Sequence, residues 1–140
     1  MRLADVNVLI NAHRTEAIEH ARYAHWLRTL AEGPEPFAIA EYILSSFLRI
    51  VTHPSALKPP TAISAALRFC RILVERPNAV LVAPGPRHWP IFARLCEGIR
   101  GPLVTNAYIA ALAIEHGCEL VSADRDFARF EGLRWRHPFA

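Results

Sequence analysis

Apolar positions along the chain follow two alternating patterns, short continuous runs and longer stretches with helical spacing. A strand buried on both faces is apolar throughout, so the runs predict strands, at 1–5, 37–40, 80–82, 119–122 and 133–136. Apolar residues three or four positions apart predict helices, at 6–10, 15–32, 41–53, 61–76 and 87–99. A last helix over 107–116 follows the segment 103–106. It is apolar nearly all round, so we expect it in the middle of the fold.

Local signals mark several helix ends. Thr15 is a candidate N-cap, with Glu16 and Glu19 in the first turn after it, and Gly117 stands where a glycine ends the buried helix. Strands that alternate with helices imply a parallel sheet covered by helices on both faces, so we predict one α/β domain over residues 1–140. In such a sheet, ligands bind at the carboxyl ends of the strands.

Composition narrows the class of protein. The chain has 140 residues, of which 52% are hydrophobic and 21% charged, a globular balance that argues against disorder. No apolar run approaches the roughly 20 residues of a membrane helix, and none at the N-terminus is long enough for a signal peptide. The 3 cysteines are too far apart for zinc or redox spacing, which favours free thiols in the cytoplasm.

Charge is mildly basic, with a formal net charge of +3. Lys58 is the only lysine, and all the other basic residues are arginines. Arginine binds phosphate bidentately and stacks on bases, which suits RNA. Codon bias is the simpler explanation for the overall preference, so the arginine content alone does not identify a partner.

Acidic residues stand at the ends of three predicted strands. Asp5 ends the first strand, Glu41 follows the second apolar run, and Asp124 follows the strand at 119–122. If these strands are parallel neighbours, the three carboxylates converge at one edge of the sheet, and Asn106 at the start of the buried helix can point to the same place. The alternative is that each acid is an ordinary turn or cap residue.

Converging carboxylates repel one another unless they are protonated or bridged by a cation. Their oxygens are hard ligands, so the expected ion is Mg²⁺ or Mn²⁺. The chain has no Walker loop, no glycine-rich phosphate fingerprint and no His/Cys ligand set. A carboxylate-held Mg²⁺ without a nucleotide loop is a common arrangement for phosphodiester hydrolysis by a metal-activated water.

Four segments, in order and at fitting spacing, resemble the motifs of PIN-domain ribonucleases, specifically the VapC-type toxins of bacterial toxin–antitoxin pairs. They are Leu3–Ile10, Glu41 with Ser46–Pro54, Leu103–Gly117 and Leu120–Phe127. The resemblance spans nearly the whole chain. It implies a PIN-like three-layer sandwich in which a short central parallel sheet is flanked by helices. It also implies Mg²⁺-dependent cleavage of structured RNA (tRNA or rRNA), a homodimer, a cognate antitoxin and no membrane association.

By this resemblance, Asp5, Glu41, Asn106 and Asp124 hold the metal and carry the catalysis. The family pattern has an acidic residue, usually Asp, where this chain has Asn106. An amide oxygen still ligates a metal, but it brings no charge and cannot act as a base. Three interpretations of Asn106 are open. The chain is an engineered inactive form, a natural variant of reduced activity, or a natural form in which the amide is tolerated. We favour the first, since the rest of the motif is intact. Alternatively, Thr105 or Asn106 simply caps the helix.

Supporting roles are assigned to residues near these four. Asn7 and Ser122 are candidates to hold the carboxylates in place, and Asp126 either adds a ligand or caps the turn after Asp124. Arg49 and Arg125 are candidates for contact with RNA phosphate, although an ordinary surface position is the simpler interpretation of each. Weaker expectations are RNA contact by Arg14 and Arg129, surface or capping roles for His13, His53 and His116, and core or interface positions for Trp26 and Trp89.

Three functions remain open from the sequence. The leading hypothesis is a metal-dependent endoribonuclease. The alternative is a binding module that holds RNA or the antitoxin without cutting. A third, a hydrolase with Asp5 as covalent nucleophile, is disfavoured because the residue two positions on, acidic in such phosphatases, is Asn7.

Overall fold

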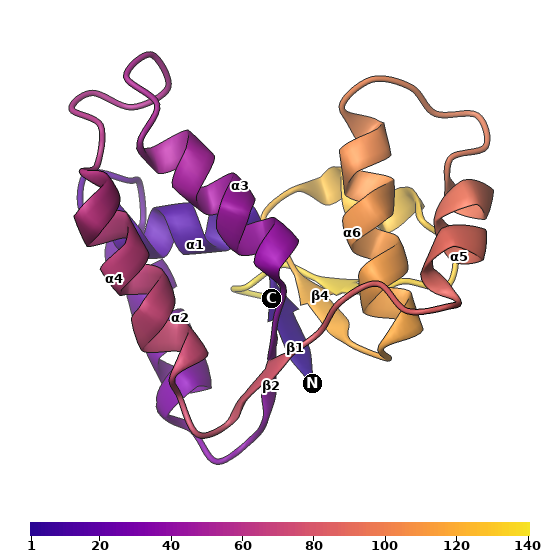
Figure 1. Ribbon diagram of the computed structural model, residues 1–140, viewed down its shortest axis with the longest axis horizontal. Helices are drawn as coiled ribbons and strands as arrows, with labels where there is room; N and C mark the ends of the chain where they lie inside the picture. The colour runs from indigo at the N-terminus through magenta and orange to yellow at the C-terminus, as the bar shows by residue number, and fades with distance from the viewer.

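The computed structural model describes residues 1–140 as a five-stranded sheet with helices on both faces (Figure 1). All neighbouring strands are parallel, in the order β3-β2-β1-β4-β5. The strands are β1 (Arg2–Ala4), β2 (Phe37–Ile39), β3 (Ala79–Leu81), β4 (Glu119–Val121) and β5 (Arg134–Arg136). The predicted α/β fold, parallel sheet and five strand positions are therefore confirmed.

The helices form the two outer layers. They are α1 (Val6–His13), α2 (His20–Glu32), α3 (Glu41–Val51), α4 (Ile63–Val74), α5 (His88–Leu95), α6 (Leu103–Glu115) and the 3₁₀ helix η1 (Arg125–Arg129). Helices α1 to α4 lie on one side of the sheet, and α5 and α6 on the other (Figure 1). None of the helices has the length and apolar character needed to cross a bilayer.

The core runs through all three layers as one cluster of 31 buried apolar residues. The three central strands supply its middle, where Leu3 pairs with Ala38 on one side and Leu120 on the other. Helix α6 is buried along Ile109–Ala113, as its all-round apolar pattern predicts. The edge strands β3 and β5 are more exposed.

Several helix boundaries differ from the prediction. Helix α2 begins at His20 rather than after Thr15, because Glu19 has a left-handed backbone (φ 60°) that no α-helix continues through. Helix α6 begins at Leu103, so Asn106 lies inside it and the capping alternative for Thr105 and Asn106 is wrong. Helix α5 ends at Leu95, earlier than expected.

The cysteines are free, as expected: Cys70 and Cys118 are buried, while Cys96 is partly exposed. Burial raises the pKa of the Cys70 and Cys118 thiols, which favours their neutral form. Trp26 packs against the core, but Trp89 is 70% exposed, which excludes the core and leaves an interface position for Trp89 as a prediction.

His13 and Arg14 are inserted into the fold rather than displayed on its surface. The His13 ring packs against Phe47 and Phe69, with centroids 5.4 and 5.0 Å away. Thr61 Oγ1 lies 3.2 Å from His13 Nε2 and accepts a hydrogen bond from the buried Arg14 at 3.0 Å. The expectation that Arg14 contacts RNA is therefore wrong, and so is the expectation that His13 lies at the surface.

We expect His13 to make stability depend on pH. Burial and the adjacent Arg14 lower the pKa of His13 below 6.5, so the unfolded chain takes up this proton first as the pH falls. Stability is thus lost between the unfolded and the lower folded pKa. His13→Gln should reduce the slope of the unfolding free energy against pH by at most about 1.4 kcal/mol per pH unit. The free energy is measured by urea denaturation between about pH 7 and 5. The control is His25→Gln at an exposed histidine, and equal slopes for the parent and His13→Gln would contradict the expectation.

Candidate functional site

The carboxyl ends of β2, β1 and β4 meet at one edge of the sheet because the three strands are adjacent and parallel. Asp5 directly follows β1, Glu41 opens α3 after β2, and Asp124 comes just after β4. We call the Asp5, Asn106 and Asp124 side chains at this place the acidic edge. The strand order agrees with the convergence that the sequence predicts.

Asp5 is held rigidly at this edge. It is the N-cap of α1, where its Oδ1 accepts the Val6 backbone N–H at 2.7 Å. Its Oδ2 accepts hydrogen bonds from Ser122 Oγ at 2.7 Å and from Asn7 Nδ2 at 2.8 Å. The residue is 5% exposed, so each carboxylate oxygen is buried and bonded.

Ser122 and Asn7 tie Asp5 to the Asp124 segment. Ser122 Oγ accepts the Asp124 backbone N–H at 3.0 Å, and Asn7 Oδ1 accepts the backbone N–H of Ala123, also at 3.0 Å. Both side chains therefore span the ends of β1 and β4. Their position agrees with the supporting role that the sequence suggests for them.

Asp124 accepts two further hydrogen bonds. Its Oδ2 accepts Asn106 Nδ2 at 3.1 Å, and its Oδ1 accepts the backbone N–H of Asp126 at 2.8 Å as the cap of η1. The Asp126 carboxylate itself is exposed and lies 3.8 Å from Arg129. Asp126 thus meets Asp124 through its backbone, which agrees with a cap and not with a ligand.

The acidic edge carries negative charge without a basic partner. Burial is the main cause that raises the pKa of Asp5, and the charge of Asp124 raises it further against the hydrogen bonds from Ser122, Val6 and Asn7. No arginine, lysine or histidine side chain forms an ion pair or hydrogen bond with Asp5 or Asp124. A bound cation would stabilise two like charges of this kind, of which Asp5 is buried and Asp124 partly buried.

Glu41 stands apart from this network. Its side chain is exposed and forms no hydrogen bond or ion pair. No group of three His, Cys, Asp or Glu side chains is arranged to hold a metal ion. The oxygen donors of Asp5 and Asp124 therefore fit a hard cation in kind, while Asn106 turns an N–H donor, not an oxygen, toward Asp124.

The arginines considered for contact with RNA differ in whether an acidic side chain already pairs with them. Arg49, in the last turn of α3, and Arg125, at the start of η1, are both exposed and form no ion pair. Arg129 faces Asp126 at 3.8 Å. Arg49 and Arg125 thus remain the candidates for an anionic ligand.

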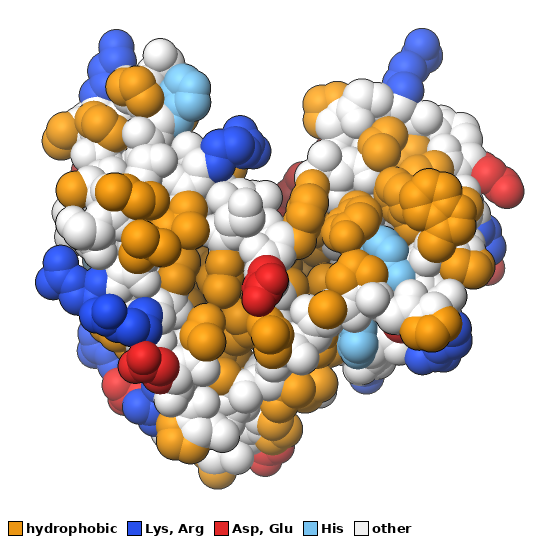
Figure 2. All heavy atoms as spheres, in the orientation of Figure 1, with side chains coloured by type: hydrophobic (Ala, Val, Ile, Leu, Met, Phe, Trp, Pro, Cys, Tyr) orange, Lys and Arg blue, Asp and Glu red, His pale blue; other side chains and the backbone are white.

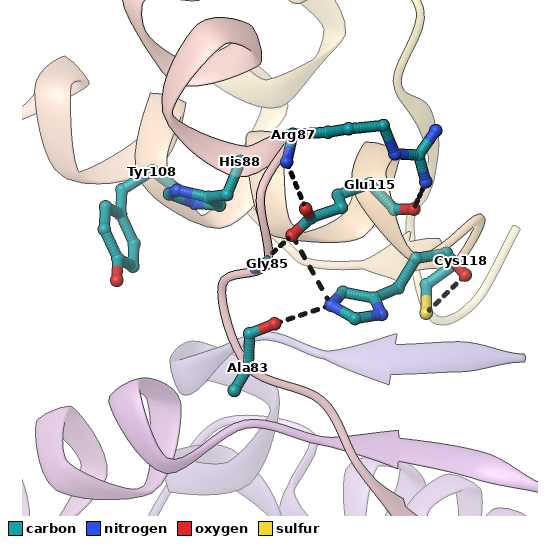
Figure 3. Close-up of polar contacts among 8 residues, drawn as sticks. Ala83, Gly85, Arg87, His88, Tyr108, Glu115 and Cys118 are labelled. Carbon is teal, nitrogen blue, oxygen red and sulfur yellow. Dashed lines mark hydrogen bonds and ion pairs between the residues drawn. The ribbon is translucent and has the colours of Figure 1, made fainter.

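Glu115 is a buried carboxylate that the sequence did not single out. Its Oε1 accepts the Gly85 N–H at 2.8 Å and its Oε2 accepts the Arg87 N–H at 2.9 Å, while Arg87 donates to the Glu115 carbonyl at 2.6 Å (Figure 3). Burial alone raises the pKa of Glu115, but the two backbone N–H groups together with His116 and His88 outweigh it and lower the pKa. The available signal was a single charge near the end of an otherwise apolar helix.

We call the contacts of Glu115 with Gly85 and Arg87 the Glu115 clamp. His116 adds a contact to it, since its Nε2 lies 2.7 Å from the Ala83 carbonyl. Together they fasten the segment before α5 to the C-terminal end of α6.

The edge strand β5 supports the acidic edge, because Trp135 Nε1 donates a hydrogen bond to the Ser122 carbonyl at 3.1 Å.

Comparison with known proteins identifies a matching family model and similar sequences. Residues 2–133 match the PIN domain model. Ribonuclease VapC43 of Mycobacterium tuberculosis is 40% identical over 140 residues, covering 99% of this chain and 95% of that protein. Ribonuclease VapC25 of the same organism is 36% identical and covers 99% of both.

Solved structures share the fold at lower identity. VapBC2 of Rickettsia felis, bound to a DNA fragment from its promoter, superposes with a TM-score of 0.71 at 19% identity and covers 97% of both chains. VapC20 of Mycobacterium tuberculosis, a toxin that cleaves the sarcin–ricin loop, gives 0.66 at 15% identity, covering 96% of this chain and 99% of that one. At these identities the likeness concerns the fold alone.

Proposed function

This chain belongs to the PIN domain family, as a relative of the VapC ribonucleases, and on that basis we propose that it is a Mg²⁺-dependent endoribonuclease toxin. The observation that carries the proposal is the acidic edge. There Asp5 and Asp124 are linked through Ser122 and lack any basic partner. The substrate class is structured RNA, tRNA or rRNA.

The residues of the chain act by position and charge. A bound Mg²⁺ or Mn²⁺ would supply an activated water and neutralise charge on the phosphoryl oxygens. Asp5 and Asp124 would hold the ion, and the exposed Glu41 would approach from α3. Ser122 and Asn7 hold the Asp5 carboxylate and fix the backbone before Asp124, and arginines at positions 49 and 125 would orient the RNA backbone.

The partner proposed for the toxin is an antitoxin protein, and the chain is proposed to act as a cytoplasmic homodimer. The solved relatives include antitoxin complexes, among them VapBC2. A basic antitoxin side chain would complement the unneutralised acidic edge. A groove of about 260 Å³ between α2 and α4, bordered by Phe69, Ile72 and Leu73, suits the apolar face of an antitoxin helix.

Removal of the Asp5 charge tests the nuclease directly. Asp5→Asn keeps a capping side chain on α1 but removes a proposed ligand, so we expect cleavage of tRNA or rRNA in Mg²⁺ to fall by about 10- to 100-fold. Titration calorimetry with Mn²⁺ should show weaker binding by the variant. The matched control is Glu32→Gln, an exposed acid at the end of α2. Equal cleavage by the parent and Asp5→Asn would refute the proposal.

A second function, a binding module that holds RNA or an antitoxin without cutting, is favoured by one observation. Asn106 presents an amide donor to Asp124, so the acidic edge has only two charged ligands. Binding that is unaffected by EDTA and yields no RNA products would support the module over the enzyme.

A further inference from the structure

A groove of about 450 Å³ lies between the first turn of α3 and the side of α6 (Figure 2). Glu41 and Tyr42 border it from α3, and Tyr108 and Leu112 from α6. Glu41 is also a proposed metal ligand, and Asn106 is only two residues from Tyr108 on the same helix. The groove therefore lies at the carboxyl end of β2, next to the strand β1, which Asp5 directly follows.

Two tyrosine rings form the aromatic part of this groove. The Tyr42 and Tyr108 centroids are 4.6 Å apart, with their planes at 37°. Tyr108 is supported by His88 at 4.5 Å and by Phe92 at 5.5 Å, and the buried His88 lies 3.0 Å from the Tyr108 carbonyl through its Nε2. Packing from α5 thus holds the Tyr108 ring in place, while Tyr42 remains 38% exposed.

The polar ends of the rings are free. The Tyr108 hydroxyl points away from the Glu115 clamp (Figure 3), and neither phenol forms a hydrogen bond with another side chain. A tyrosine in this state offers both a stacking face and a hydrogen-bond group to a ligand.

Charge indicates which part of an RNA fits here. Glu41 is the only charged residue that borders the groove, and no arginine, lysine or histidine borders it. A phosphate has no positive partner in the groove, whereas a neutral, planar base with polar edges is complementary to it.

We propose that Tyr42 and Tyr108 form a base-binding subsite that takes one unpaired base of the RNA next to the phosphodiester at the acidic edge. This inference rests on the proposed nuclease function and adds to it a determinant of substrate choice. Unstacked bases in loops are the usual targets when proteins recognise RNA sequence. The subsite would therefore direct cleavage to an unpaired position of a folded RNA.

The test measures binding of a fluorescent pentauridylate and pentaadenylate in EDTA, beside sugar–phosphate pentamers of the same length that carry no base. One stacked base contributes enough that Tyr42→Leu and Tyr108→Leu should each weaken binding of at least one intact oligonucleotide by about tenfold. The pentamers that carry no base should bind the parent and the leucine variants equally. Tyr42→Phe and Tyr108→Phe keep the ring and should stay within about threefold of the parent.

Trp89→Leu is the control, because Trp89 is an exposed aromatic residue that does not border the groove. An equal loss in this variant, or leucine variants that bind as the parent does, would overturn the subsite. So would a change from dimer to monomer in sedimentation of the leucine variants, which would make the groove an interface between copies. If all variants cut RNA at the same rate and at the same sites, the base-binding subsite is contradicted and the proposed function stands. If the parent neither binds nor cuts RNA, the proposed function is contradicted as well.

Discussion

Asn106→Asp is expected to raise Mg²⁺-dependent RNA cleavage by at least about tenfold, the size of effect that residues around a metal typically have. Asn106 Nδ2 now donates to Asp124 Oδ2 at 3.1 Å. A carboxylate in its place removes this hydrogen bond and adds a charge beside Asp124 and Asp5. The three acids repel one another unless a cation binds, so the affinity for Mg²⁺ rises with the activity.

Stability provides a second measurement for this variant. Without metal, Asn106→Asp should melt at a lower temperature than the parent, and Mg²⁺ should raise its melting temperature more than that of the parent. Thr105→Asp adds the same charge at an exposed neighbouring position and is the control. The prediction fails if Asn106→Asp and Thr105→Asp respond alike to Mg²⁺ and cut RNA no faster than the parent.

Loss of the Glu115 clamp is expected to reduce the free energy of unfolding most among single changes outside the apolar core. Glu115→Ala removes two partly buried hydrogen bonds, from the N–H groups of Gly85 and Arg87, and a hydrogen bond to a charged acceptor contributes about 1.5–3 kcal/mol. We expect a loss of about 3 kcal/mol in urea denaturation. Glu115→Gln keeps one acceptor oxygen and should lose less.

Two further comparisons sharpen this expectation. Gly85→Ala keeps the acid but places a Cβ 2.8 Å from Glu115 Oε2, so it should also destabilise the clamp. Because the pKa of Glu115 is lowered on folding, its contribution is complete above the usual pKa of 4.5 and is lost as the pH falls through the folded value. Glu32→Ala, at an exposed acid, is the control. A loss no larger for Glu115→Ala than for Glu32→Ala would contradict the role of the clamp.

The periodic pattern of the sequence predicted the elements that depend on it. Five apolar runs became five strands, and the apolar stretch after 103 became the buried helix α6. Convergence of acids at one edge followed from the rule that parallel strands end together, and the sheet order agrees with it. The metal and the catalytic roles of Asp5, Glu41, Asn106 and Asp124 remain proposals.

Other features were outside the reach of the sequence. Thr15 is of a residue type that caps helices, but α2 begins only after Glu19, whose backbone is left-handed. His13 resembled a surface residue until Phe47 and Phe69 packed around it. Glu115 acquired its role only when the segment at Gly85 reached it across the fold.

By itself, the sequence determined the order of strands and helices, the α/β class and the placing of acids just past strand ends. These depend on local patterns, continuous apolar runs for buried strands and a period of about 3.6 residues for helices, which are visible within a few neighbouring positions. Only the tertiary structure decided which side chains meet. The hydrogen bond from Ser122 to Asp5 joins residues 117 positions apart, and no local pattern encodes such a pair. Burial, which shifts the pKa of Asp5 and isolates its charge, exists only once the chain has folded.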